Sequence, residues 1–166
     1  MSDPEIRRRA RLGELVANFC SVDLKWAAPL AGEKEPEYTQ RALFPQFEDF
    51  VKRINEPKLR LFADGSVSRP LPIFLSDQRF YPDISLDLDG MRTVAIEVKY
   101  LPSSNYSGSL SKALGQGLIY ASLGYQEAHV ILVSTDGGKV LPVEEISVLN
   151  ANSSNSLVHA HELASN

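Results

Sequence analysis

The chain has 166 residues, 43% of them hydrophobic and 23% charged, with a formal net charge of −4. These values are typical of one soluble globular domain, which at this length buries roughly 70% of the surface of its unfolded chain. No apolar run is long enough to span a membrane and no secretory signal opens the sequence, so we expect a cytoplasmic protein without a membrane partner. The single cysteine, Cys20, excludes an internal disulfide and any cluster held by four thiolates.

Residues 1–36 are predicted to form a helix and then an irregular segment. Residues 2–5 have a capping-box pattern, and apolar residues recur with helical spacing from Glu5 to about Phe19. Four arginines lie near the start of this helix, at positions 7, 8, 9 and 11. They either contact phosphate groups or form a solvated helix face, and their small number favours the solvated face. Prolines and a glycine then interrupt residues 23–36.

The stretch from Glu37 to Asn55 has the character of a helix that Pro45 either kinks or divides into two. Glu48 lies at the edge of its apolar stripe, where a carboxylate is costly unless it is paired. Two interpretations of Glu48 remain open. It forms a salt bridge with Lys52 one turn later, or it belongs to a functional site.

Strand patterns follow. Residues 58–63 read as a short strand, and residues 67–75 as an extended piece that two prolines confine to a sheet edge. Beyond Tyr81, two alternating apolar runs flank Asp89-Gly90, which predicts a β-hairpin.

The register of this hairpin decides which charged residues meet. Buried faces pair apolar with apolar side chains, so we expect Ile84 opposite Ile96 and Leu86 opposite Val94. That register places Asp83 directly across from Glu97. It requires an odd-length loop or a bulge around residues 89–91, because a plain two-residue turn would put Asp83 opposite Ile96.

Two facing carboxylates repel each other unless a positive charge lies between them. Mg²⁺ or Mn²⁺ takes oxygen ligands and suits Asp83 and Glu97, with the carbonyl of Val98 as a further ligand. Lys99 shares a strand face with Glu97 and would position a metal-activated water beside a phosphate. The plainer alternative is that Asp83 begins a strand while Glu97 and Lys99 form an exposed charged face without a ligand.

A polar loop, residues 101–108, leads into a helix that Ser109 or Ser111 caps and Gly124 ends. On one face of this helix lie Lys112, Gln116 and Tyr120. Lys112 is a candidate phosphate contact. The small residues Gly115 and Gly117 would let the helix pack closely on the sheet, and without the hairpin motif Gln116 and Tyr120 would read as a half-buried polar edge.

Residues 126–134 predict a buried strand, parallel to the strand of Lys99 because a helix connects the two. Residues 139–148 predict one more strand or a short helix near the edge, and residues 149–166 a loosely ordered tail. His159 and His161 alternate like strand residues. With no further ligand nearby in the sequence, they are interpreted as incidental.

These residues together resemble a known family. Pro82-Asp83, thirteen further residues and then Glu97-Val98-Lys99 resemble the motif of the PD-(D/E)xK nuclease superfamily. Gln116 and Tyr120 resemble the Gln-x-x-x-Tyr motif that RecB-type members carry on the helix after the lysine strand. The resemblance covers roughly residues 45 to 135.

The resemblance implies an α/β fold with a restriction-endonuclease-like core, a small mixed sheet flanked by helices in αβββαβ order. The core would occupy residues 37–148 of a single domain, after an extra N-terminal helix. It implies a Mg²⁺-dependent deoxyribonuclease in which Asp83, Glu97 and Lys99 are catalytic. Gln116 and Tyr120 would position nucleic acid, and a helix glutamate would join the metal, with Glu48 as first candidate and Glu37 as second. The absence of a four-cysteine set excludes the iron–sulfur type of RecB-like nuclease.

Other function classes stay open. The net charge of −4 is unusual for a protein that grips DNA, since phosphate contacts come from lysine and arginine. A non-catalytic module that keeps the nuclease fold for protein assembly or DNA binding, or an enzyme acting on small nucleotides, would fit that charge. A homodimer could cut two strands. The chain has no phosphate-binding loop for ATP, so a helicase motor would have to be a separate partner subunit.

Overall fold

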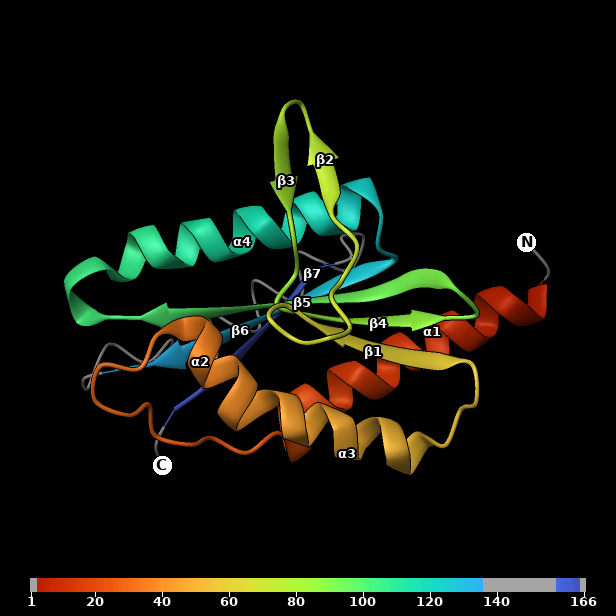
Figure 1. Cartoon of the computed structure of the whole chain (residues 1–166), viewed down its shortest axis with the longest axis horizontal. Coiled ribbons are helices and arrows are strands. Elements are labelled where there is room, and N and C mark those ends of the chain that lie inside the picture. The colour runs from red at the N-terminus through yellow and green to blue at the C-terminus, as the bar shows by residue number, and fades with distance from the viewer. Residues whose placement is uncertain (1–2, 136–157, 165–166) are drawn as a thin grey trace.

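The structure is a computed structural model and describes residues 3–135 and 158–164. Five strands form one mixed sheet in the order β1-β4-β5-β6-β7, with helices on both faces (Figure 1). The expected α/β class, a mixed sheet flanked by helices, is confirmed. Within the described part of the chain, no helix combines the length and apolar character needed to cross a membrane.

The elements have the following bounds. The helical elements are α1 (Asp3–Asn18), the π-helical turn η1 (Phe19–Asp23), α2 (Glu35–Tyr38), the π-helical turn η2 (Thr39–Leu43), α3 (Phe44–Ile54), the 3₁₀ turn η3 (Ser103–Asn105) and α4 (Tyr106–Leu123). The strands are β1 (Leu59–Ala63), β2 (Ile73–Leu75), β3 (Gln78–Phe80), β4 (Ile84–Leu88), β5 (Met91–Leu101), β6 (Glu127–Ser134) and β7 (Val158–Leu163).

The second helical region begins two residues earlier than predicted, at Glu35. Pro36 lies in its first turn, and the backbone N–H of Lys34 donates to the Glu37 carboxylate at 3.0 Å, which satisfies one of the free donors at the helix start. Pro45 lies in the first turn of α3, so it begins a second helix after the π-helical turn η2. Asn55, with φ of 52°, ends α3 in the left-handed conformation.

The sheet combines both kinds of strand pairing. β1, β4 and β5 are antiparallel neighbours, whereas β6 runs parallel to β5 and β7 runs parallel to β6. The predicted parallel crossover through α4 is confirmed. The extended piece at residues 67–75 contributes only β2, which pairs with β3 in a separate two-stranded hairpin that projects from the sheet (Figure 1).

The register of the central hairpin is the predicted one, with Ile84 opposite Ile96 and Leu86 opposite Val94. The bulge that produces this register lies at a different place from the expected one. Asp89 and Gly90 form a plain two-residue turn, both with positive φ (56° and 75°), and the register shift falls between Leu86 and Asp87, opposite Thr93. The Thr93 hydroxyl donates to the Met91 carbonyl at 2.9 Å and so supports the bulge from inside.

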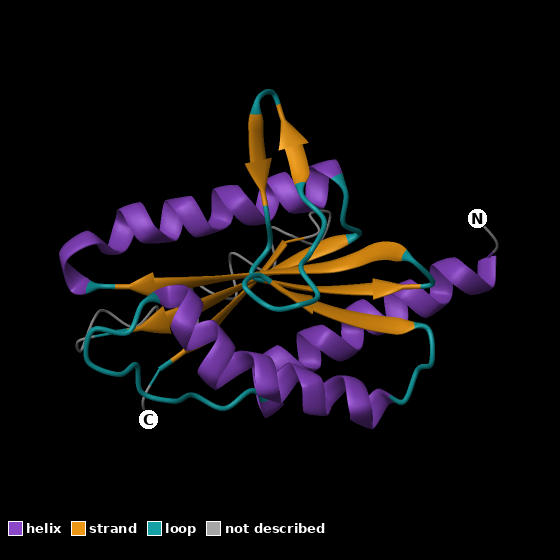
Figure 2. Ribbon diagram, in the orientation of Figure 1, coloured by secondary structure: helices purple, strands orange, loops and turns teal. Residues whose placement is uncertain are grey.

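Each face of the sheet has its own apolar core. On one face, even-numbered residues of β4 and β5 such as Ile84 and Ile96 pack with α1 and α3. On the other face, Ala95 and Leu101 of β5 pack with Tyr120 of α4. Figure 2 shows α4 along one side of the strands and α1 and α3 along the other. The alternation of a strand therefore sends the charged odd-numbered residues of β5 toward α4.

Two boundaries in the second half differ from the prediction. Helix α4 begins at Tyr106, ahead of both predicted serine caps, and ends before Gly124 as expected. The predicted loose tail contains β7, whose sequence Val-His-Ala-His-Glu-Leu alternates apolar residues as a paired strand does. The element predicted at residues 139–148 lies outside the described residues.

Candidate functional site

The structure brings Asp83, Glu97 and Lys99 together at one end of the sheet, on the α4 face. Asp83 directly precedes β4, while Glu97 and Lys99 are alternate residues of β5. Glu97 and Lys99 are buried, with 3% and 8% of their surfaces exposed, so they do not form the exposed charged face of the plainer interpretation. Buried charged groups require partners, and each of the three has one.

Asp83 is held against the backbone of β5. Its Oδ2 accepts a hydrogen bond from the Val98 N–H at 2.7 Å, just beyond the last strand pair of β4 with β5. Its own carbonyl accepts from the Asp64 N–H at 2.9 Å, which fixes the chain as it enters β4. The N–H and C=O of one strand residue point to the same side, so the Val98 carbonyl also faces the side of Asp83.

Glu97 is held by α4. The hydroxyl of Tyr120 lies 2.9 Å from Glu97 Oε2 and 2.8 Å from the carbonyl of Tyr81. Tyr120 has one hydroxyl hydrogen for these two neighbours. When the Tyr120 hydroxyl donates to the Tyr81 carbonyl, a protonated Glu97 carboxyl group can donate to the Tyr120 oxygen. All three groups then have a hydrogen-bond partner.

Lys99 is held by a residue that the sequence interpretation did not identify, Glu35 at the start of α2. Lys99 Nζ donates to Glu35 Oε1 at 2.5 Å and lies 3.4 Å from Glu97 Oε1. The second oxygen of Glu35 accepts from the Tyr100 N–H at 2.8 Å. One carboxylate therefore fixes both the side chain of Lys99 and the backbone that follows it.

The electrostatics of the cluster favour a cation. Burial raises the pKa of both carboxyl groups, and for Glu97 the neighbouring charge of Asp83 raises it further. Burial lowers the pKa of Lys99, but the hydrogen bond to Glu35 and the surrounding carboxylates outweigh it and raise the pKa above its ordinary value. Lys99 is thus a firmly held ammonium. With all groups ionised, three carboxylates face one ammonium.

This donor set fits a hard divalent ion. Asp83, Glu97 and the Val98 carbonyl offer only oxygen atoms, which is the preference of Mg²⁺ and Mn²⁺. A cation there would offset the repulsion that raises the pKa of the two carboxyl groups. The Mg²⁺ or Mn²⁺ ion itself stays a prediction from the sequence.

The predicted residues of α4 divide into two kinds. Tyr120 is buried and contacts Glu97, so it braces the site from inside. Gln116 lies one turn earlier and is half-buried, and its side-chain oxygen is buried without a hydrogen-bond partner among the described residues. Lys112 is exposed a further turn away, where it is accessible to a ligand.

The structure does not place Glu48 or Glu37 in the site. Glu48 is exposed on α3, and its predicted partner Lys52 instead pairs with Asp49 at 3.3 Å. The Glu37 carboxylate caps its own helix at Lys34. The helix glutamate of this cluster is Glu35, which the sequence interpretation left in an irregular segment. Pro36 and Glu37 directly after it are a helix-start signal that would have located it.

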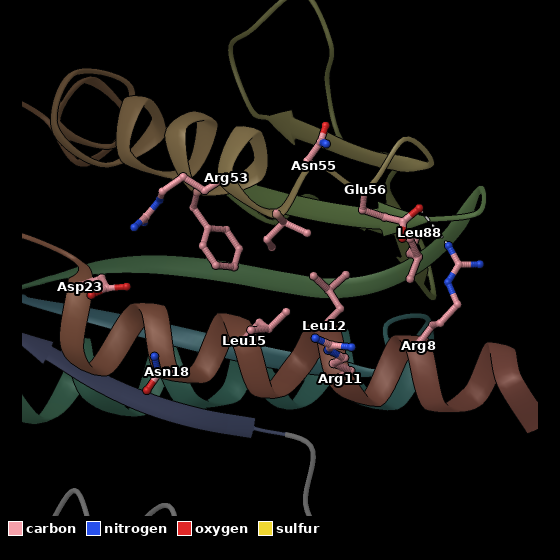
Figure 3. Close-up of a pocket in the computed structure, with 12 residues that line it drawn as sticks. Arg8, Arg11, Leu12, Leu15, Asn18, Asp23, Arg53, Asn55, Glu56 and Leu88 are labelled. Carbon is pink, nitrogen blue, oxygen red and sulfur yellow. Dashed lines mark ion pairs between the residues drawn. The ribbon is translucent and has the colours of Figure 1, made fainter.

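The arginines of α1 lie at the opposite end of the sheet. Arg8 and Arg11 line a cavity between α1 and α3, together with Arg53 and with Leu88, the last residue of β4 (Figure 3). Arg8 also pairs with Glu56 and Asp89 at 3.0 and 2.9 Å. Asp83 precedes the other end of β4, so this cavity between α1 and α3 is not part of the carboxylate site.

Comparison of the chain with protein-family models, with curated proteins and with solved structures finds no match.

Proposed function

We propose that the protein is a metal-dependent nuclease that hydrolyses phosphodiester bonds in DNA, with its site at Asp83, Glu97, Lys99 and Glu35. One observation carries the proposal: the carboxylates of Asp83, Glu97 and Glu35 gather near the buried ammonium of Lys99, close to the end of β5. The order of elements supports it too, since one helical region, three sheet strands, α4 and β6 follow one another as in the restriction-endonuclease-like core.

Asp83 and Glu97 would hold Mg²⁺, with the Val98 carbonyl as a further ligand. When bound, the ion supplies Lewis acidity toward a phosphate and lowers the pKa of a water. The residues of the chain position the groups that would hold the ion. The Val98 N–H aims Asp83, and Tyr120 aims Glu97, so both carboxylates are positioned before a substrate arrives.

Lys99 acts as a donor in this arrangement. Because nearby carboxylates raise its pKa, it carries a proton and cannot serve as a general base in the resting protein. Its N–H groups can hold a water beside the phosphorus or stabilise charge on a phosphate oxygen. Glu35 keeps that ammonium in place, which makes Glu35 a positioning residue.

The proposal is tested with single-stranded, duplex and flapped DNA, in Mg²⁺ or Mn²⁺ and in EDTA. Wild-type protein is expected to cut at least one substrate in metal and none in EDTA, and product lengths distinguish internal from terminal cleavage. Asp83→Asn and Lys99→Ala should abolish cutting. Asp49→Asn, an exposed change on α3, is the matched control and should cut normally.

Calorimetry with Mn²⁺ separates the function classes. Binding that Asp83→Asn removes and Asp49→Asn keeps, together with cleavage, supports the nuclease. Folded protein that neither binds Mn²⁺ nor cuts any DNA would overturn the catalytic proposal and favour a non-catalytic assembly module. Cleavage of dinucleotides without cleavage of DNA would indicate a small-nucleotide substrate.

A further inference from the structure

A second cluster of chemically reactive side chains lies on the α1 face of the sheet. Cys20 from η1, His129 from β6 and His161 from β7 are all buried. One ligand atom from each, the cysteine sulfur and a ring nitrogen of each histidine, lie within 4.8 Å of one another. The interpretation of His161 as a residue without a ligand nearby is therefore wrong. Strand pairing of β6 with β7 brings together residues that are far apart in the sequence.

The sheet separates this cluster from the carboxylate site. His129 shares its strand face with Ile131 and Val133, which pack in the core beneath α1 and α3. Glu97 and Lys99 point to the α4 face. The two clusters are thus on opposite sides of one layer of backbone and have no ligand in common.

Hydrogen bonds orient both imidazole rings. His129 Nδ1 and His161 Nε2 face each other at 2.8 Å. The outer nitrogen of each ring has its own partner: His129 Nε2 lies 3.0 Å from Glu127 Oε1, and His161 Nδ1 lies 3.1 Å from Ser21 Oγ. A carboxylate and a hydroxyl behind the rings are the supporting partners that fix metal-ligating histidines elsewhere in proteins.

The carboxylate of Glu127, which contacts His129, packs closely against helix α1. Glu127 lies against Gly13 of α1, where a Cβ atom would stand only 2.3 Å from its oxygens. The glycine lets α1 pass directly over the carboxylate. The ring of His159 stacks on the ring of His129, with the two centroids 5.0 Å apart.

We propose that Cys20, His129 and His161 bind one zinc-class transition-metal ion. Thiolate and imidazole are the donors that zinc prefers, in contrast to the oxygen donors on the α4 face. The three side chains leave one position of a tetrahedron for a ligand from outside this set. The proposal does not depend on the nuclease function.

The protons balance on binding. In the metal-free protein, burial raises the pKa of the Cys20 thiol and lowers the pKa of both buried histidines to about 3, so the thiol is protonated and the rings are neutral. The ion displaces the thiol proton to solvent. With the Glu127 carboxylate accepting from His129 Nε2–H, His129 Nδ1 accepts from His161 Nε2–H in the metal-free protein. On binding, that proton leaves His161 Nε2, and His161 Nδ1–H donates to Ser21 Oγ.

The ion would connect the end of α1 with the edge of the sheet. Because Cys20, His129 and His161 come from three separate elements, the ion would bind the folded chain far better than the unfolded one. The expected consequence is structural, a higher melting temperature.

Cobalt absorption tests the site directly. Metal-stripped full-length protein is titrated with Co²⁺, and we expect thiolate-to-cobalt charge-transfer absorption that saturates at one ion per chain and disappears when Zn²⁺ is added. Cys20 is the single cysteine of the chain, so this absorption reports on Cys20 alone. Zn²⁺ should raise Tm by about 5 °C or more.

Cys20→Ser should lose both the absorption and the Tm increase, whereas Asp83→Asn should keep both. His161→Gln is the second variant, with circular dichroism as the check of folding. Folded wild-type protein that gives no charge-transfer absorption with Co²⁺ and no Tm change with Zn²⁺ would overturn the proposal. The cluster would then be a buried hydrogen-bond chain.

Discussion

Glu35 is the residue on which the arrangement of Lys99 depends. Its two oxygens bind Lys99 Nζ and the Tyr100 N–H. Glu35→Gln keeps the shape but removes the charge that holds the ammonium. We expect DNA cleavage to fall about 10- to 100-fold, the usual effect of losing a supporting partner.

Glu48→Gln is the comparison for this prediction, because Glu48 is exposed on α3 and should leave cleavage unchanged. Initial rates in Mn²⁺ measure both variants. A Glu48→Gln protein that loses cleavage while Glu35→Gln retains it would show that the metal-bound state uses a different helix carboxylate.

Tyr120 offers a second residue-scale prediction, on stability. Tyr120→Phe removes the hydroxyl that contacts both the Glu97 carboxyl group and the Tyr81 carbonyl, and so leaves two buried polar groups without this partner. We expect the free energy of unfolding to fall by roughly 1–3 kcal/mol in urea titration without metal.

Tyr100→Phe is the matched control for Tyr120→Phe. The Tyr100 hydroxyl is buried and has no hydrogen-bond partner among the described residues. Its removal should change the free energy of unfolding by less than about 0.5 kcal/mol. Equal losses in the two variants would mean that the ring contacts matter and the hydroxyl of Tyr120 does not.

At the scale of elements, the packing of α4 on the sheet gives a prediction with opposite signs at two glycines. A Cβ at Gly117 would stand 2.9 and 3.0 Å from methyl groups of Val130 and Val158, whereas a Cβ at Gly115 meets nothing within 4 Å. Gly117→Ala should destabilise the protein by roughly 1–3 kcal/mol through overpacking. Gly115→Ala should stabilise it by up to about 1 kcal/mol through helix propensity.

Thermal unfolding of the two glycine variants checks this difference. If Gly117→Ala is as stable as Gly115→Ala, α4 can move away from β6 and β7 without cost, and Tyr120 would not be held as closely as the contacts indicate.

The turn between β4 and β5 leads to a prediction about how stability depends on pH. Asp89 contacts Lys58 and Arg8, each at 2.9 Å, and these charges lower the pKa of its carboxyl group, the hydrogen bond to Lys58 most of all. A lowered pKa in the folded state means that the stabilisation is present above the pKa of the unfolded chain and is lost as pH falls through the folded value.

Asp89→Asn isolates this effect, because asparagine tolerates the positive φ of 56° at this position. Tm of the wild type should exceed that of Asp89→Asn at pH 7, and the difference should shrink as the pH falls below 3.8 and also in high salt. A difference that does not shrink as the pH falls below 3.8, the ordinary pKa of the carboxyl group, would show that the carboxylate charge is not its cause.

The elements that sequence reasoning located are those set by local pattern. Apolar alternation determined the pairing of Ile84 with Ile96, because a slip by one residue would expose the whole buried face. The register predicts an odd-length loop or a bulge around residues 89–91, whereas the bulge lies at Thr93, because either position gives the same register. Pro36 and Glu37 are a local signal that puts Glu35 at a helix start, but no local pattern contains its contact with Lys99, 64 residues further along the chain.

The same reasoning applies to the thiol and imidazole cluster. Cys20 and His161 belong to elements at opposite ends of the chain, and neither residue carries a local signal of the other. The alternation in residues 158–163 did contain a strand signal, and with β7 assigned beside β6 the two histidines would have been placed together.

At the scale of the whole molecule, one sheet separates two sites of different donor chemistry. Oxygen donors face α4, and a thiol with two imidazoles faces α1. Since the sites share no residue, their contributions to stability should add within about 0.5 kcal/mol. Mn²⁺ should raise Tm in Cys20→Ser by as much as in the wild type, and Zn²⁺ should do so in Asp83→Asn.

The double variant Asp83→Asn with Cys20→Ser completes this test. Its Tm should respond to neither ion, and at saturating concentrations of both ions its loss of stability should equal the two single losses combined. Differential scanning calorimetry with each ion alone and with both together provides the measurement. A loss clearly larger or smaller than that sum would show that β5 and β6 transmit strain between the faces, so that filling one site changes the geometry of the other.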